Sequence, residues 1–174
     1  MADVPEGIVL RRHRDLAGRR WHPWLRRALV GLVGLFAVLG LFDVFGQRPA
    51  TARVSADAAT LRISAPHAVR GGLLFQARFT IVAHEELKDA TLVLGQGWLD
   101  GLTVNTIEPS PLSEASRDGS LVFGLGHLAA GAKYVLYIEY QVNPTTVGRR
   151  TQTIELADGE VPILSTKRSL MVYP

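Results

Sequence analysis

Cysteine is absent from this 174-residue sequence, and lysine is scarce, with three residues against sixteen arginines. The lack of cysteine excludes disulfides, thiol nucleophiles, iron–sulfur clusters and cysteine-ligated zinc sites. It does not define the compartment, because an exported domain that builds a hydrophobic core can fold without disulfides. The chemistry of this chain must therefore come from its charged, aromatic and apolar residues.

A surplus of positive charge is also lacking in most of the chain. Residues 1–27 carry seven arginines against three acidic residues, a net charge of +4, whereas residues 47–174 carry twelve basic and twelve acidic residues. Nucleic-acid binding needs a basic face that neutralises phosphates, so we expect no nucleic-acid partner. We interpret residues 1–27 as a basic cytoplasmic arm beside anionic lipid, with docking to a cytoplasmic protein as the alternative.

One long apolar run stands out. Residues 28–42 are all apolar, and the run resumes after Asp43 as far as Gly46. A helix over residues 28–46 would be about 28 Å long, close to the hydrocarbon thickness of a bilayer, and it would have no polar face. We predict a transmembrane helix over these residues. Asp43 falls in its last turn, near the headgroups, because a carboxylate at mid-bilayer costs about 2.5–3.5 kcal/mol.

The residues before this run predict its orientation. Trp21 and Trp24 suit an interfacial aromatic belt, and Arg26 and Arg27 precede the apolar residues directly. Arginines are enriched on the cytoplasmic side of membrane helices, so the N-terminus should be cytoplasmic and the C-terminal part extracytoplasmic. The alternative is a signal peptide cut after the A-x-A pattern at residues 50–52, which would also place the main domain outside the cytoplasm.

The rest of the sequence follows the two-residue period of strands. Residues 47–59 are polar and rich in Ala and Thr, which predicts a stalk. Apolar and polar residues then alternate in six segments: 72–83, 88–95, 119–126, 132–142, 149–156 and 167–173. Turn residues separate them, with Asp118-Gly119 and Asp158-Gly159 as hairpin tips and residues 108–117 as the longest loop. We predict an all-β fold over residues 60–174, an antiparallel β-sandwich.

Two segments carry a family resemblance: FTIVAHEELKDATLVLGQGWLDGLTVNTIEPSP and DGSLVFGLGHLAAGAKYVLYIEYQV. Gly101-Leu102 before a strand, and the Gly126–Gly131 turn before a long alternating strand, resemble bacterial Ig-like surface modules. These modules are the cell-adhesion-related domain and the repeat domain of unknown function eleven. The resemblance covers residues 60–156 and implies an Ig-like fold with an adhesive or architectural role, and no catalytic residues. The chain differs from tandem arrays by its single domain and its N-terminal apolar segment.

Residues that often perform catalysis are scattered. His67, His84 and His127 lie in different segments without metal-ligand spacing, and no serine stands in a G-x-S-x-G elbow. We therefore expect no catalytic residues, no metal site and no cofactor, and we predict that the chain is not an enzyme. An active site assembled only in three dimensions remains an alternative.

Two features suggest contacts with other molecules. Trp98 is the only tryptophan after the apolar run and is preceded by Gly95-Gln96-Gly97, so it could stack on a sugar or anchor a partner, or else fill the end of the core. Arg149 and Arg150 begin a strand, where they could bind an acidic partner or lipid headgroups, or else form a solvated strand end.

Together these patterns predict a non-enzymatic, single-pass membrane protein. Its Ig-like domain would bind another membrane or envelope protein, as an accessory subunit of a larger complex. A cell-wall or glycan-binding module built around Trp98 is the alternative function.

Overall fold

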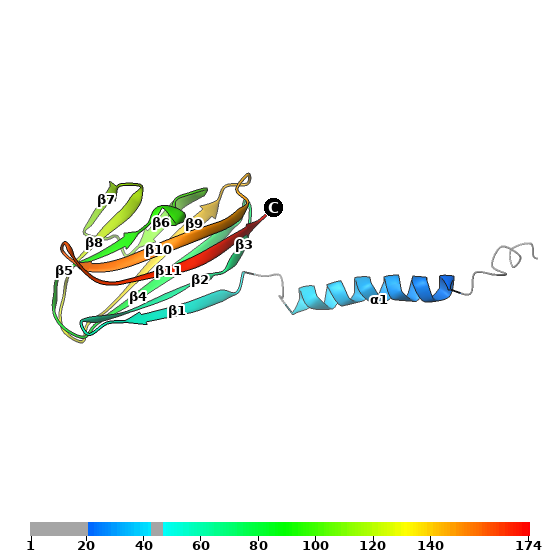
Figure 1. Ribbon diagram of the computed structural model, residues 1–174, viewed down its shortest axis with the longest axis horizontal. Coiled ribbons are helices and arrows are strands. Elements are labelled where there is room, and N and C mark those ends of the chain that lie inside the picture. The colour runs from blue at the N-terminus through cyan, green and yellow to red at the C-terminus, as the bar shows by residue number, and fades with distance from the viewer. Residues whose placement is uncertain (1–20, 43–46) are drawn as a thin grey trace, which may run out of the picture. The chain divides into compact units, whose positions relative to one another are not determined.

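A computed structural model describes residues 21–42 and 47–174 of this chain (Figure 1). The chain divides into two compact units, residues 1–46 and 47–174. The predicted anchor residue Asp43 and most of the basic arm lie outside the described residues.

The first unit contains one helix, α1, from His22 to Leu41. It begins six residues before the predicted start at Ala28, because Pro23 is tolerated in the first turn of a helix and the residues after it favour helix. None of its residues is buried, and by length and composition the helix is long and apolar enough to cross a membrane. It is the one such helix among the described residues.

The second unit is a sandwich of two sheets (Figure 1). The five-stranded sheet has the order β1-β2-β4-β9-β6 and the six-stranded sheet has the order β3-β11-β10-β5-β8-β7. The strand bounds are β1 Pro49–Ser55, β2 Ala59–Pro66, β3 Ala68–Arg70, β4 Leu74–Ala83, β5 Leu87–Leu94, β6 Leu102–Glu108, β7 Ser113–Arg117, β8 Ser120–Leu128, β9 Lys133–Val142, β10 Gly148–Asp158 and β11 Val161–Tyr173. A short 3-10 turn, η2, spans Gln96–Trp98. The fold class predicted from the sequence is confirmed.

Three local expectations need correction. The predicted stalk contains β1, which pairs with β2 from Pro49↔Pro66 to Ser55↔Thr60. This edge strand escaped prediction because its inward-facing residues are mostly alanines rather than large apolar residues. The predicted loop 108–117 contains β7, a fully exposed edge strand without an apolar face. One strand pair, β3 with β11, is parallel within the otherwise antiparallel sheets.

The core lies between the two sheets and follows the predicted alternation. On β4, Phe75, Ala77, Phe79 and Ile81 are at most 4% exposed. The alternate positions of this strand face outward, as in a half-buried strand. The predicted hairpin tip between β7 and β8 is also present, with Asp118 and Gly119 at φ +50° and +73°. Both values are positive, as a two-residue hairpin turn requires.

Candidate functional site

The predicted anchor flanks belong to α1 or directly precede it. Trp21 lies immediately before the helix, while Trp24, Arg26 and Arg27 lie in its first turns. The Arg27 guanidinium lies 5.6 Å from the centre of the Trp24 ring, a cation–π distance. Trp21 and Trp24 are 60% and 70% exposed. The helix therefore carries an aromatic and cationic N-terminal segment followed by an uncovered apolar one.

Trp98 is not a surface residue. Its side chain has 0% exposure and packs between the sheets, 5.3 Å from the ring centre of Phe79 and 5.6 Å from that of Tyr140. A sugar cannot stack on a ring that the core covers completely. The interpretation of Trp98 as a ligand platform is therefore wrong, and the tryptophan fills the core.

A group of polar atoms is buried around Trp98. The Arg168 guanidinium lies 5.6 Å from the Trp98 ring centre and donates to the carbonyls of Ala65 and Pro66. Burial lowers the pKa of Arg168 to about 10, and burial also raises the pKa of Tyr140. Among the described residues, Trp98 Nε1, the Tyr140 hydroxyl, the Gln152 amide and Arg168 Nη1 have no hydrogen-bond partner. The sequence alternation indicated that these strands are buried, but it did not indicate this group.

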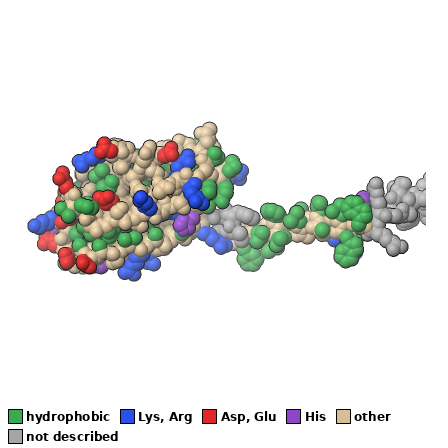
Figure 2. Space-filling view, in the orientation of Figure 1, with side chains coloured by type: hydrophobic (Ala, Val, Ile, Leu, Met, Phe, Trp, Pro, Cys, Tyr) green, Lys and Arg blue, Asp and Glu red, His purple; other side chains and the backbone are tan. Residues whose placement is uncertain are grey.

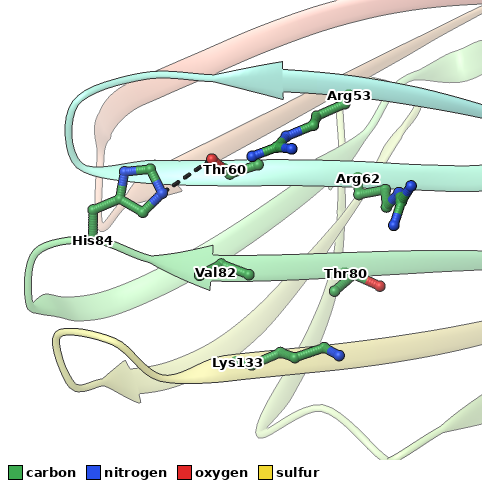
Figure 3. Close-up of a pocket in the computed structure, with 7 residues that line it drawn as sticks. All are labelled: Arg53, Thr60, Arg62, Thr80, Val82, His84 and Lys133. Carbon is green, nitrogen blue, oxygen red and sulfur yellow. Dashed lines mark hydrogen bonds between the residues drawn. The ribbon is translucent and has the colours of Figure 1, made fainter.

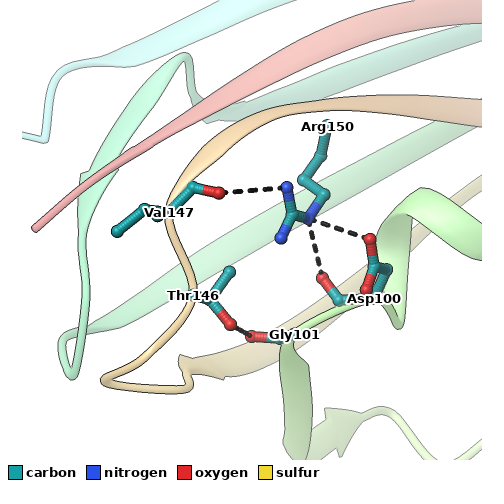
Figure 4. A network of polar contacts seen from close by, with 5 residues as sticks. All are labelled: Asp100, Gly101, Thr146, Val147 and Arg150. Atoms are coloured by element: carbon teal, nitrogen blue, oxygen red, sulfur yellow. Dashed lines mark hydrogen bonds and ion pairs between the residues drawn. The ribbon is translucent and has the colours of Figure 1, made fainter.

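The side chain of Arg150 is held by contacts within the sandwich (Figure 4). Its Nε lies 3.0 Å from Asp100 Oδ2 and 3.3 Å from the Asp100 carbonyl, and its Nη1 donates to the Val147 carbonyl at 3.3 Å. Beside it, the Thr146 hydroxyl donates to the Gly101 carbonyl at 3.3 Å. These contacts connect the turn after η2 to the β9–β10 loop. The guanidinium of Arg150 therefore already has an ion-pair partner and hydrogen-bond partners within the sandwich, whereas Arg149 is exposed.

A row of cationic side chains, which the sequence patterns did not indicate, lies on the outer face of the five-stranded sheet. Arg53, Arg62 and Lys133 line a shallow groove of about 260 Å³ over β1, β2, β4 and β9 (Figure 3). The cross-strand pairs Arg53↔Arg62, Arg62↔Thr80 and Val82↔Lys133 place these positions on one face. All three cationic side chains are exposed.

A second groove of about 370 Å³ lies on the same face toward Pro49, lined by Arg78, Tyr137 and Gln76 among others. Arg78 is opposite Ser64 on β2 and Tyr137 on β9, so it continues the row. We call Arg53, Arg62, Arg78 and Lys133 the basic face. Two carboxylates share this sheet face: Glu139 on β9 is opposite Gln76, next to the Arg78–Tyr137 pair, and Glu108 is on the edge strand β6.

The cations of the basic face make no ion pair or hydrogen bond with the described residues. Arg53 and Arg62 are direct cross-strand neighbours, and like charges placed opposite each other destabilise a sheet. Single-sequence reasoning could not find this arrangement, since it depends on β1 joining the sheet in this register.

A hydrogen-bond relay closes one end of the groove (Figure 3). His84 Nδ1 donates to the Asp57 carbonyl at 3.1 Å, because a carbonyl can only accept. His84 Nε2 lies 3.0 Å from the Thr60 hydroxyl, which in turn lies 2.6 Å from the Ser55 hydroxyl. The relay joins the β1–β2 and β4–β5 turns and gives the groove a polar wall.

Within residues 21–42 and 47–174, no three His, Asp or Glu side chains converge as metal ligands. His127 Nε2 lies 2.9 Å from Glu86, an exposed pair, and His67 and His84 lie elsewhere. The expectations that the chain uses no metal or cofactor and performs no catalysis stay predictions.

No protein-family model matches the sequence, and no curated protein matches it. Among solved structures, CaCohA2 from Clostridium acetobutylicum is similar at a TM-score of 0.47, with 13% identity over 68% of this chain and 93% of its own. The CARDB domain of a Pyrococcus furiosus protein, in complex with di-metal ions, has a TM-score of 0.39 and 12% identity, over 72% and 90%. The human F-spondin reeler domain has a TM-score of 0.38 and 12% identity, over 68% and 93%.

At these identities the likeness concerns the fold alone. The resemblance to the Ig-like surface modules stays a prediction, since no family model matches the sequence.

Proposed function

We propose that this chain is a single-pass membrane protein whose extracytoplasmic sandwich binds an acidic surface of another membrane or envelope protein. It would act as an accessory, non-enzymatic subunit. The observation that carries the proposal is the basic face. Arg53, Arg62, Arg78 and Lys133 share one exposed sheet surface and make no ion pair or hydrogen bond with the described residues.

Charge complementarity supports a partner of this kind. Residues 47–174 have equal numbers of basic and acidic residues. A cationic surface on this neutral domain therefore means that basic side chains are grouped apart from most acidic ones. Segregated charge steers association and selects partners by sign. The adjacent Arg53 and Arg62 repel each other in the free protein, and an acidic partner would relieve that repulsion.

The membrane-anchoring part of the proposed function rests on α1. Its large apolar side chains are exposed along its length, from Leu25 at 48% to Leu41 at 85%. Burial of such side chains is worth about 1.5–3 kcal/mol each, so a bilayer is a strongly favoured environment for this helix. The arginines of residues 1–27 support a cytoplasmic N-terminus.

The alternative function, glycan binding, depended on Trp98 as an exposed residue. Trp98 is buried, and the grooves of the five-stranded sheet offer Tyr137 at 36% exposure as their most accessible aromatic side chain. No observation favours glycan binding over a protein partner.

The test is a pull-down of the full-length chain in mild detergent. We expect a stoichiometric membrane or envelope partner that dissociates as salt is raised, because salt screens exposed charges. The double substitution Arg53→Glu and Arg62→Glu should abolish recovery of the partner. The control substitution, Arg117→Glu with Lys167→Glu, makes the same change in net charge at exposed residues of the six-stranded sheet and should retain it. Recovery of the chain alone, or equal loss in both double variants, would refute the proposal.

A further inference from the structure

Exposed apolar side chains gather at one end of the sandwich. Four of them are about half exposed: Leu73 at 47%, Leu74 at 50%, Val147 at 52% and Tyr173 at 56%. Main-chain hydrogen bonds hold the segments that carry them together. Gly71 donates to the Tyr173 carbonyl, Gly72 donates to Val142, and Val142 donates to Leu73. We call this the Pro49 end, since β1 begins there with Pro49 opposite Pro66.

The charges at this end are cationic. Arg70 and Arg149 are exposed, and Asp100 is already paired with Arg150. The opposite end of the sandwich carries carboxylates in its turns: Asp57, Glu85, Glu86, Asp158 and Glu160. Figure 2 shows most of the red side chains toward that end, green side chains at the Pro49 end, and blue side chains at both ends. The carboxylates named above therefore lie at the end of the sandwich opposite the Pro49 end.

We propose that the Pro49 end is a lipid-contacting surface that rests on the anionic headgroups of the membrane in which α1 is anchored. Leucine, valine and tyrosine side chains beside arginines match the chemistry of the membrane interface. Anionic headgroups attract Arg70 and Arg149 and repel the carboxylates at the opposite end. This inference rests on the proposed function, because it requires α1 to be in the bilayer.

The chain connection supports lipid as the occupant. Residues 42–48 join Leu41 to Pro49, and seven connecting residues reach at most roughly 25–30 Å even when fully extended. A protein partner would need no such proximity, and it has the basic face available on another surface. An anchored α1 keeps the Pro49 end of its own sandwich within reach of the headgroups.

The test uses the absence of cysteine in the full-length chain. Single variants Val147→Cys and Leu73→Cys are labelled with an environment-sensitive fluorophore and reconstituted in phosphatidylcholine–phosphatidylglycerol vesicles. Lipids that carry a nitroxide near the headgroup then quench labels at the membrane surface. We expect strong quenching at both positions and little at the control Val161→Cys, which is 67% exposed beside Glu160. Equal quenching at positions 73, 147 and 161 would overturn the inference.

A fourth label separates the two proposals. Phe36→Cys lies within α1, so its quenching by acyl-chain nitroxides reports insertion of the helix. If position 36 is quenched and positions 73 and 147 are not, anchoring stands and the lipid-contacting surface is refuted. If position 36 is not quenched, both proposals fail. A blue shift at position 147 that grows with the protein-to-lipid ratio, without quenching, would assign the surface to a second copy and also overturn the inference.

Charge-reversal variants test whether the headgroup charge holds this end. With Arg70→Glu and Arg149→Glu, the label at Val147 should lose at least half of its quenching in the anionic vesicles. Lys88→Glu, an exposed residue near the carboxylate end, should leave the quenching unchanged. Equal quenching in all three proteins would show that headgroup charge does not hold this end, and the electrostatic part of the inference would be wrong.

Discussion

Leucines in the two units of this chain have opposite surroundings. In α1, Leu29 and Leu35 are 59% and 54% exposed, whereas Leu61 and Leu136 of the sandwich are 0% exposed. The sandwich covers its apolar residues with its own two sheets, but α1 has no second layer among the described residues. The sandwich therefore buries its own apolar side chains, whereas the described residues provide no such cover for those of α1.

The largest effect should come from a cavity in the sandwich. Phe79→Ala removes a fully buried ring that packs against Trp98, and we expect the sandwich to lose about 3–5 kcal/mol of stability. Phe36→Ala in α1 deletes the same ring from an exposed position and should leave sandwich stability unchanged. Denaturant unfolding of the full-length chain in mild detergent, followed by near-ultraviolet circular dichroism, measures both. Equal losses would mean that the two units do not fold independently.

The next largest effect concerns the helix alone. Leu35→Arg places a charge near the middle of α1, at a cost of about 2.5–3.5 kcal/mol for insertion. We expect the chain to move from the membrane fraction to the soluble fraction, measured by flotation of vesicles after synthesis in their presence. Leu112→Arg is the matched control, because Leu112 is 79% exposed on the sandwich, and it should still float. Flotation of the Leu35→Arg variant at the wild-type level would contradict membrane anchoring by α1.

The same contrast explains what could be predicted from the sequence. An unbroken apolar run specifies the helix. Apolar residues at alternate positions specify strands such as β4, where Phe75, Ala77, Phe79 and Ile81 face inward as expected. Strand β1 lacks that signal because two of its three inward positions hold alanine, so its pairing with β2 decides its structure. The basic face depends on this pairing, which brings Arg53 opposite Arg62. Polar residues on separate strands form a site only when the strand register places them side by side. That register cannot be read from a single sequence.

A smaller effect is expected at the Pro49 end of the sandwich. Arg150→Ala removes an ion pair with Asp100 and a hydrogen bond to the Val147 carbonyl. Asp100 is 57% exposed and water screens the pair, so the expected loss is about 1 kcal/mol in denaturant unfolding. Arg149→Ala, at an exposed neighbouring position, should change stability by less than about 0.5 kcal/mol. Equal losses of stability in the two variants would contradict a stabilising role for the contacts of Arg150.

The smallest effect at neutral pH should come from Tyr140→Phe. The Tyr140 hydroxyl is buried without a hydrogen-bond partner among the described residues, so its removal should change stability by less than about 1 kcal/mol. The effect grows at alkaline pH. Burial raises the pKa of Tyr140, so an unfolded chain loses the phenol proton more readily than the folded one, and stability falls as the pH rises above about 10.

Burial lowers the pKa of Arg168 to about 10, and this gives the opposite trend, because folding disfavours its charged form and the penalty declines above that pH. Arg168 is present in both proteins, so the difference between wild type and Tyr140→Phe isolates the tyrosine. The variant should therefore lose less stability than wild type between pH 9 and 11, measured by denaturant unfolding. Parallel pH profiles would show that the Tyr140 hydroxyl has access to water in the folded sandwich. The contrast between a self-covered core and an uncovered helix would then be less complete than the exposures indicate.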